Sequence, residues 1–271
     1  MSEISVLISF IIGVIQGVLE WLPVSSEGIT SLYLGIFTDV SPENSVKMAL
    51  FLHGGTAVSA LTYYRKRVVE LLRSNGEWRI NPDNTELVFL VVATFSSVIV
   101  GFTVYKLLVN LVTSLAGGVF ITGIGVLLVF TGLIQKEAED KAGRHRETPT
   151  VKDAVLIGSL QGLAILPGVS RSGTTVSALL LRDYEAPISL ELSFLLSIPA
   201  AFGAGVLILL ETGEVPSMNP LSASAAFAVS AAVGYVTIDA LMKAVKKVNF
   251  WLICVFFGGL AVFGGVVTLL L

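Results

Sequence analysis

Two stretches of this chain, 145 residues apart, are near copies of one another, and both interrupt apolar sequence with a proline and a serine-rich turn. Residues 16–28 read QGVLEWLPVSSEG, and residues 161–173 read QGLAILPGVSRSG. Inside a lipid bilayer, broken backbone leaves polar groups unpaired unless protein or a water-filled cavity surrounds them. Such turns do not help a protein to span the bilayer. We therefore interpret the two turns as its functional site.

The composition places the chain in a membrane. It is 54% hydrophobic and only 14% charged, with a mean hydropathy of +0.85, values that ordinary soluble domains do not show. A spanning helix needs roughly 20 apolar residues. Six runs are long enough, and they cover about 46–64, 87–108, 115–134, 188–210, 221–242 and 250–271. We therefore expect an all-α integral membrane protein with six transmembrane helices.

The segments that follow the two turns are too short to cross. Residues 24–38 and 169–181 would reach only about 20 Å at 1.5 Å per residue, against a hydrocarbon core of about 30 Å. Each copy is therefore predicted to form a re-entrant helix hairpin, at about 4–38 and about 151–182. The first arm, residues 4–22, is by itself long enough to span, so a crossing first arm stays open.

The copies divide the chain into two repeats. The first repeat covers residues 1–134, with its hairpin and three transmembrane helices, and the second covers residues 151–271 with the same content. A polar cytoplasmic linker, 135–150, joins them. Because the first half has three spans, an odd number, the second half is inverted in the membrane. The two turns therefore enter the membrane from opposite faces. Such an inverted-topology repeat puts its site near the bilayer midplane.

Basic residues set the orientation. Fourteen of the 17 lie in loops that share one face under this topology, whereas Lys47 alone lies on the other. The fourteen are Arg65, Lys66, Arg67, Arg73, Arg79, Lys136, Lys141, Arg144, Arg146, Lys152, Arg182, Lys243, Lys246 and Lys247. By the positive-inside rule that face is cytoplasmic. We expect a multi-pass protein of the plasma membrane with both termini outside.

Each turn has the chemistry of an anion site. Pro23 and Pro167 should end the first arm of each hairpin, because proline removes a backbone donor. A serine then caps the second arm, either Ser25 or Ser26 in the first copy and either Ser170 or Ser172 in the second. Unpaired N–H groups and the positive helix end attract anions there.

Arg171 and Glu20 are the charges that the two turns carry into apolar sequence. A guanidinium in such a place needs an anionic partner, and its forked donors suit phosphate oxygens. The alternative is a structural ion pair of Arg171 with Glu20 that locks the halves together. Both interpretations can hold for one pair, because a locking partner can also orient a catalytic arginine.

Further candidates surround the first turn. Glu20 and Glu27 bracket it, so a divalent cation such as Mg²⁺ or Ca²⁺ could join their carboxylates to phosphate oxygens, although Glu27 could equally point to outside water. Ser26 is a candidate nucleophile that needs a base. His53 is either an accessory acid–base group or a partner in an interhelical hydrogen bond.

The two motifs resemble those of the undecaprenyl-diphosphate phosphatase family of the BacA/UppP type. EWLPVSSEG at 20–28 is similar to the family's E-[FW]-L-P-[VI]-S-S-[ST]-G-H, and PGVSRSG at 167–173 is similar to its P-G-x-S-R-S-G. The resemblance implies a membrane enzyme with inverted repeats that removes the terminal phosphate of a polyprenyl diphosphate, usually with Mg²⁺ or Ca²⁺. It also implies a phosphate site made by Glu20, Ser25, Ser26, Ser170, Arg171, Ser172 and Thr175.

Three positions depart from the family pattern. Ile29 stands where the motif has its histidine, Gln16 where many members carry a second acid, and Glu27 where a small hydroxyl residue is usual. Isoleucine cannot exchange a proton. If the family histidine acts as nucleophile or base, Glu20, Glu27 or His53 must replace it here.

Two other functions fit an inverted repeat. A polyprenyl-phosphate transporter or flippase would move the lipid without hydrolysis, and an ion-coupled transporter would carry a small anion. Among these, we expect the phosphatase, with a polyprenyl diphosphate and the bilayer as partners and a homodimer as a possible assembly. Nucleic acid is not an expected partner, because the net charge is -3 and the basic residues are spread over several loops.

Overall fold

The computed structural model describes residues 4–73, 85–112, 117–141, 146, 148–244 and 249–270, and it is helical throughout these ranges apart from short connections. The basic residues Arg79, Arg144, Lys246 and Lys247 of the orientation argument lie outside them. Eleven helices form within the described ranges. They are α1 (Val6–Leu19), α2 (Ser26–Phe37), α3 (Pro42–Tyr63), α4 (Arg65–Arg73), α5 (Thr85–Val112), α6 (Gly117–Lys141), α7 (Val151–Leu163), α8 (Arg171–Leu181), α9 (Ala186–Thr212), α10 (Pro220–Ala244) and α11 (Phe250–Leu270).

Five of these helices are long and apolar enough to cross a membrane, namely α5, α6, α9, α10 and α11. The chain is therefore a multi-pass membrane protein, as its composition predicts. The sixth expected span, 46–64, falls in α3, which has 22 residues but a more polar sequence. Most of α3 is buried against other helices, so protein rather than lipid surrounds its polar side chains.

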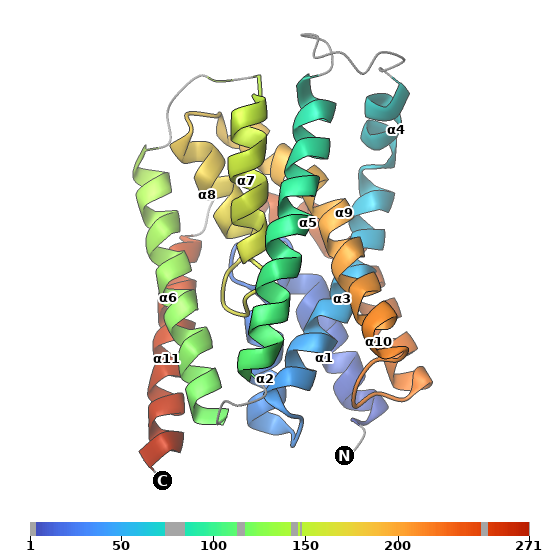
Figure 1. The fold of residues 1–271 in the computed structure, drawn as a ribbon, viewed down its shortest axis with the longest axis vertical. Helices are drawn as coiled ribbons and strands as arrows, with labels where there is room; N and C mark the ends of the chain where they lie inside the picture. The colour runs from blue at the N-terminus through green and yellow to red at the C-terminus, as the bar shows by residue number, and fades with distance from the viewer. Residues whose placement is uncertain are drawn as a thin grey trace.

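The four helices that flank the two turns are short. α1, α2, α7 and α8 have 14, 12, 13 and 11 residues, or between about 16 and 21 Å at 1.5 Å per residue. α1 ends at Leu19 and α7 at Leu163, each four residues before its proline. In Figure 1, α1 and α2 rise from the end of the molecule that holds both chain termini, whereas α7 and α8 descend from the opposite end.

The long helices pack around these hairpins in pairs. α1 packs against α10, α7 against α5, α6 against α11 and α3 against α9. Several contacts need glycine, because the backbones approach too closely for a side chain. A Cβ at Gly158 of α7 would lie 2.2 Å from the carbonyl oxygen of Ala93 in α5, and a Cβ at Gly17 of α1 would lie 2.8 Å from the amide nitrogen of Gly234 in α10.

A buried carboxylate lies at the end of the second hairpin that is farthest from its turn. Asp153, in the first turn of α7, accepts hydrogen bonds from Thr150, from Arg182 at 2.7 Å and from Tyr184 at 2.7 Å. Burial tends to raise the pKa of Asp153, but these hydrogen bonds and the Arg182 charge hold it below its ordinary value. Because Arg182 and Tyr184 follow α8, the carboxylate ties the two arms of the hairpin together.

The close packing of α7 on α5 predicts a stability effect. Gly158→Ala should clearly lower the melting temperature in detergent, because overpacking costs about 1–3 kcal/mol and the neighbouring atoms belong to the rigid backbone of Ala93. Gly123→Ala in α6 is the matched control, since a Cβ there meets nothing within 4 Å. Equal melting temperatures for both variants would contradict the packing described here.

Candidate active site

The two interrupted turns meet in the middle of the molecule. The Ser25 hydroxyl accepts hydrogen bonds from the Gly28 amide of its own turn at 3.2 Å and from the Gly168 amide of the other turn at 3.1 Å. The Ser172 hydroxyl donates across to the Leu22 carbonyl at 3.1 Å. Ser25 adopts a φ of 60°, which a non-glycine residue keeps only where its surroundings hold it. The two tips therefore form one hydrogen-bonded unit.

Neighbouring helices pair the carbonyl groups that the turns leave open. Gln135 of α6 donates to the Pro23 carbonyl at 2.6 Å, the Cys254 thiol contacts the same oxygen at 3.2 Å, and Thr131 donates to the Gly168 carbonyl at 3.2 Å. This is how irregular backbone can persist inside a membrane protein. Gln135 lies in helix α6 and is buried, although the sequence suggested that it begins a polar linker.

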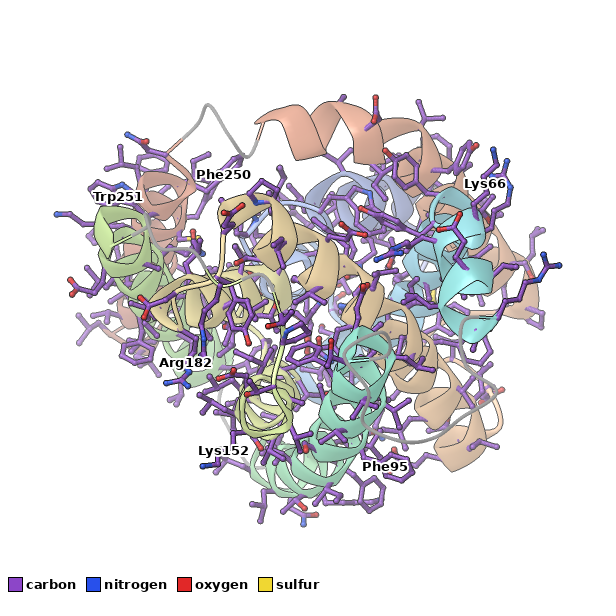
Figure 2. The ribbon with its side chains drawn as sticks, turned by 90° about the horizontal axis from the view of Figure 1, so that it is seen from above. Lys66, Phe95, Lys152, Arg182, Phe250 and Trp251 are labelled. Carbon is purple, nitrogen blue, oxygen red and sulfur yellow. The ribbon has the colours of Figure 1, made fainter. Side chains whose placement is uncertain are left out.

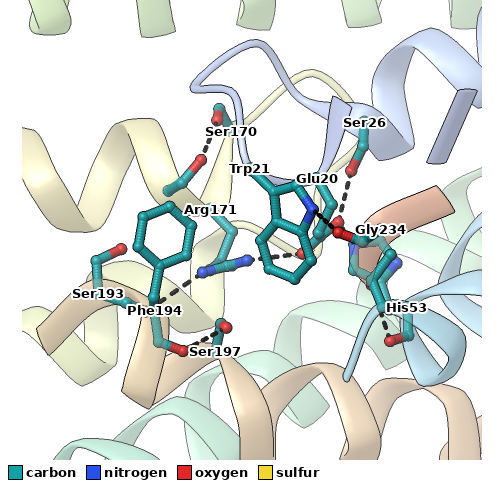
Figure 3. Close-up of polar contacts among 12 residues, drawn as sticks. Glu20, Trp21, Ser26, His53, Ser170, Arg171, Ser193, Phe194, Ser197 and Gly234 are labelled. Carbon is teal, nitrogen blue, oxygen red and sulfur yellow. Dashed lines mark hydrogen bonds and ion pairs between the residues drawn. The ribbon is translucent and has the colours of Figure 1, made fainter. Parts of the chain in front are cut away.

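Glu20 is the centre of the polar cluster between the turns (Figure 3). Its Oε1 accepts a hydrogen bond from Arg171 at 2.7 Å, and its Oε2 accepts from Gln16 at 2.7 Å and from the Ser26 hydroxyl at 2.9 Å. His53 Nε2 lies 3.5 Å from the same Oε2. Glu20 is 4% exposed, so these contacts compensate the carboxylate for the loss of bulk water.

Each partner of Glu20 is itself oriented. Arg171, the first residue of α8, also donates to the Ser193 carbonyl of α9 at 3.3 Å. His53 comes from α3, and its Nδ1 lies 2.9 Å from the Ala49 carbonyl. A carbonyl only accepts, so Nδ1 carries the proton and Nε2 is the nitrogen that faces Glu20.

Two connected spaces adjoin this cluster. The polar pocket, about 10 Å³, has room for about one water molecule. It is lined by Glu20, Leu22, Ser25, Ser26, Glu27, His53, Ala164, Val169, Ser170, Arg171 and Ser172. The apolar groove, about 210 Å³, is lined mainly by α5 and α9, and it shares Glu27, His53, Ala164 and Arg171 with the polar pocket.

The predicted hydroxyl residues separate into two groups. Ser25 and Ser170 are the N-caps of α2 and α8, and with Ser172 they line the polar pocket. Thr175 lies further along α8, where its hydroxyl donates to the Arg171 carbonyl at 2.9 Å and contacts the Ser193 hydroxyl. Thr175 lines neither the polar pocket nor the apolar groove, so it supports Arg171 from behind.

Glu27 is buried and faces both spaces. It is 3% exposed, and within the described ranges its Oε1 has no hydrogen-bond partner. It therefore does not point to outside water. No group of three His, Cys, Asp or Glu side chains forms a metal cage in the described part of the chain. Because the oxygens of Glu20 are engaged, Glu27 is the carboxylate that fits a cation shared with phosphate oxygens.

Ile29 points away from the cluster. It packs with Val24, Phe250 and Cys254 and lines neither the polar pocket nor the apolar groove. The imidazole near Glu20 belongs instead to α3, a placement that the motif spacing does not reveal. Gln16 was also only a departure from a pattern in the sequence, whereas the structure shows it donating to Glu20.

Comparisons with known proteins identify the family of this chain. The family model described as bacitracin resistance protein BacA matches residues 9–263. A protein of Haloarcula marismortui named undecaprenyl-diphosphatase is 51% identical over 98% of this chain and 99% of its own length. Proteins of the same name from Methanococcoides burtonii and Methanothrix thermoacetophila are 36% and 35% identical, over 94% and 92% of this chain and 96% and 93% of their own lengths.

The contact between the turns predicts that Ser25 matters more than an ordinary helix cap. Ser25→Ala would leave the Gly28 and Gly168 amides without their acceptor, at a cost of about 1–3 kcal/mol for each buried group. Ser41→Ala, which removes the exposed N-cap of α3, should cost only about 1 kcal/mol. Thermal unfolding in detergent compares the two, and an equal loss would show that the turns do not depend on Ser25.

Proposed function

The chain belongs to the family of the bacitracin resistance protein BacA, and on that premise we propose that it is a membrane phosphatase. Its reaction removes the terminal phosphate of a polyprenyl diphosphate, an undecaprenyl-like lipid, and so recycles the lipid carrier. The relatives named undecaprenyl-diphosphatase support this reaction. The observation that carries the proposal is the buried cluster of Glu20, Arg171 and Ser26, of which Arg171 also lines the apolar groove.

The two spaces suit the two parts of such a lipid. Phosphate groups would be bound where Arg171, Ser170 and Ser172 line the polar pocket, beside the amide groups that begin α2 and α8. The prenyl chain would lie in the apolar groove, whose exposed residues Val98 and Phe102 place its edge at the lipid. The rest of a long chain would stay in the bilayer.

Ser26 is the proposed nucleophile. Its hydroxyl donates to Glu20, and Arg171 and Gln16 orient Glu20, which is the arrangement of an activated nucleophile. Ser26 Oγ would bond to the terminal phosphorus while the bond from phosphorus to the bridging oxygen breaks. The polyprenyl phosphate leaves with that electron pair, and Arg171 balances the charge on the transferred group. Water then hydrolyses the phosphoserine, restoring the Ser26 hydroxyl and releasing phosphate.

A divalent cation fits one position in this scheme. Mg²⁺ or Ca²⁺ would be bound by Glu27 together with phosphate oxygens of the substrate, since Glu27 has a carboxylate oxygen without a partner in the described ranges. When bound, such a cation neutralises negative charge on the diphosphate. Glu20 keeps its role as the acceptor that orients Arg171 and Ser26.

We further propose that the fold is an inverted repeat of six spans and two re-entrant hairpins, with 1–134 and 151–271 as its halves. The equivalent packing of α1 on α10 and of α7 on α5 supports this symmetry. The basic end, where Lys66, Lys152 and Arg182 project (Figure 2), would be cytoplasmic, with the termini outside in a plasma membrane. Glu20, Ser26 and Arg171 come together within a single chain.

Activity is tested with purified protein, a polyprenyl diphosphate and Mg²⁺, by measuring released phosphate. Arg171→Ala and Ser26→Ala should each lower the rate by about 100-fold or more, because each removes a group that acts in the transition state. Arg171→Lys keeps the charge but loses the forked donors, so it should fall between wild type and Arg171→Ala. Wild-type release no faster than that of Arg171→Ala would reject the phosphatase.

Orientation is tested with single cysteines. Glu214→Cys, in the exposed connection between α9 and α10, should react in intact cells with a maleimide that cannot cross membranes. Lys152→Cys, at the opposite end, should react only after the cells are permeabilised. The native Cys254 is 1% exposed and gives the background. The reverse pattern of labelling would place the termini inside.

A further inference from the structure

One oxygen of Glu20 lies between two groups that can exchange protons. Glu20 Oε2 accepts the Ser26 hydroxyl at 2.9 Å, and His53 Nε2 lies 3.5 Å from the same atom. We propose that His53 is the proton-transfer residue of this site, receiving the Ser26 proton by way of Glu20 Oε2. This inference rests on the proposed phosphatase function, and it gives the missing motif histidine a replacement from a different helix.

Glu20 cannot hold the proton itself. Its two oxygens together accept hydrogen bonds from Arg171, Gln16 and Ser26, and the Arg171 guanidinium lies at 2.7 Å. All of these contacts favour the charged carboxylate. A proton that arrives from Ser26 would weaken the ion pair with Arg171 inside a site that excludes water. Glu20 therefore passes the proton on.

His53 has the geometry to receive it. Its Nδ1 donates to the Ala49 carbonyl at 2.9 Å, so Nε2 is the free position of the neutral ring. Once Nε2 is protonated, the resulting imidazolium has one partner for each N–H, the Ala49 carbonyl and the Glu20 carboxylate. An ionised carboxylate beside the ring stabilises that form.

The surroundings of His53 favour this assignment over the other candidates. The charged groups that line the polar pocket with it are Glu20, Glu27 and Arg171, and the α9 residues that line the apolar groove are uncharged. Glu27 has no hydrogen bond to Ser26 or Glu20 within the described ranges, so it is not part of the relay. Ile29 faces α11.

The leaving group and the Ser26 proton each have a destination in the proposed step. Ser26 Oγ forms a bond to the terminal phosphorus, and the bond from phosphorus to the bridging oxygen breaks, so the polyprenyl phosphate departs with the electron pair. The Ser26 proton moves to Glu20 Oε2 and from there to His53 Nε2. His53 releases this proton to water after the product leaves, which returns the ring to its neutral form.

The test compares His53→Asn and His53→Gln with Thr56→Val in purified protein. Asparagine can keep the donor to the Ala49 carbonyl, glutamine can place an amide near Nε2, and neither amide can accept a proton as imidazole does. Thr56, one turn further along α3, lines neither space and serves as the matched control. The measurements are kcat and KM for a polyprenyl diphosphate, and the melting temperature of each variant.

We expect both His53 variants to lose about 100-fold or more in kcat, with KM changed less than about threefold, because the group acts in the chemical step. Thr56→Val should keep the wild-type kcat and KM.

Either folded His53 variant with kcat within about threefold of wild type overturns the proposal. So does a defect confined to KM, which would make His53 a binding residue. These outcomes leave the phosphatase itself standing. Wild-type protein that releases no phosphate above the Arg171→Ala background would instead remove the function on which the inference rests.

Discussion

The ion pair between Glu20 and Arg171 joins the two halves of this protein at a distance of 2.7 Å. The two residues are 151 positions apart and come from the two copied turns. Each charge would be costly to bury alone, because a membrane interior offers no water to solvate it. The pair forms only if both turns reach the same place, so the pairing of the charges and the meeting of the hairpins depend on each other.

The turns remain interrupted because protein satisfies their backbone. Ser25 and Ser172 connect the two tips by hydrogen bonds. From α6, Gln135 and Thr131 donate to carbonyl groups that the turns leave open. Thr131 and Gln135 are therefore polar residues of a spanning helix whose side chains serve the turns. These polar groups keep the helix starts accessible, and the N–H groups and dipoles at those starts would form the proposed anion site.

Local chemistry made much of this architecture predictable. The two prolines predicted that the first arms end at Pro23 and Pro167, and the helices end four residues before them, at Leu19 and Leu163. The serines predicted the caps near Ser25 and Ser170, because capping acts within a few residues. The sequence also left the pairing of Glu20 with Arg171 as one of two interpretations. The structure shows that pair.

Contacts between distant helices could not be predicted in the same way. The sequence named His53 as an accessory acid–base candidate, but nothing near it shows that its ring would meet Glu20. Gln135 was predicted to begin a solvated linker because charged residues follow it. The burial of α3 was also not predictable, since a hydropathy window cannot distinguish a helix that faces lipid from one that faces protein. Such features depend on packing, which a single sequence does not encode locally.

The size of the polar pocket bears on how a substrate could bind. About 10 Å³ is too little for a phosphate group, so a headgroup would have to displace contacts that now fill the site. Arg171 is the group best able to exchange partners, because it lines both spaces and a phosphate offers it the same forked acceptors as Glu20. In that exchange the guanidinium would never be without an anion, and Glu20, relieved of one donor, would become a better acceptor for the Ser26 proton. Binding of the headgroup and activation of the nucleophile would then be one event.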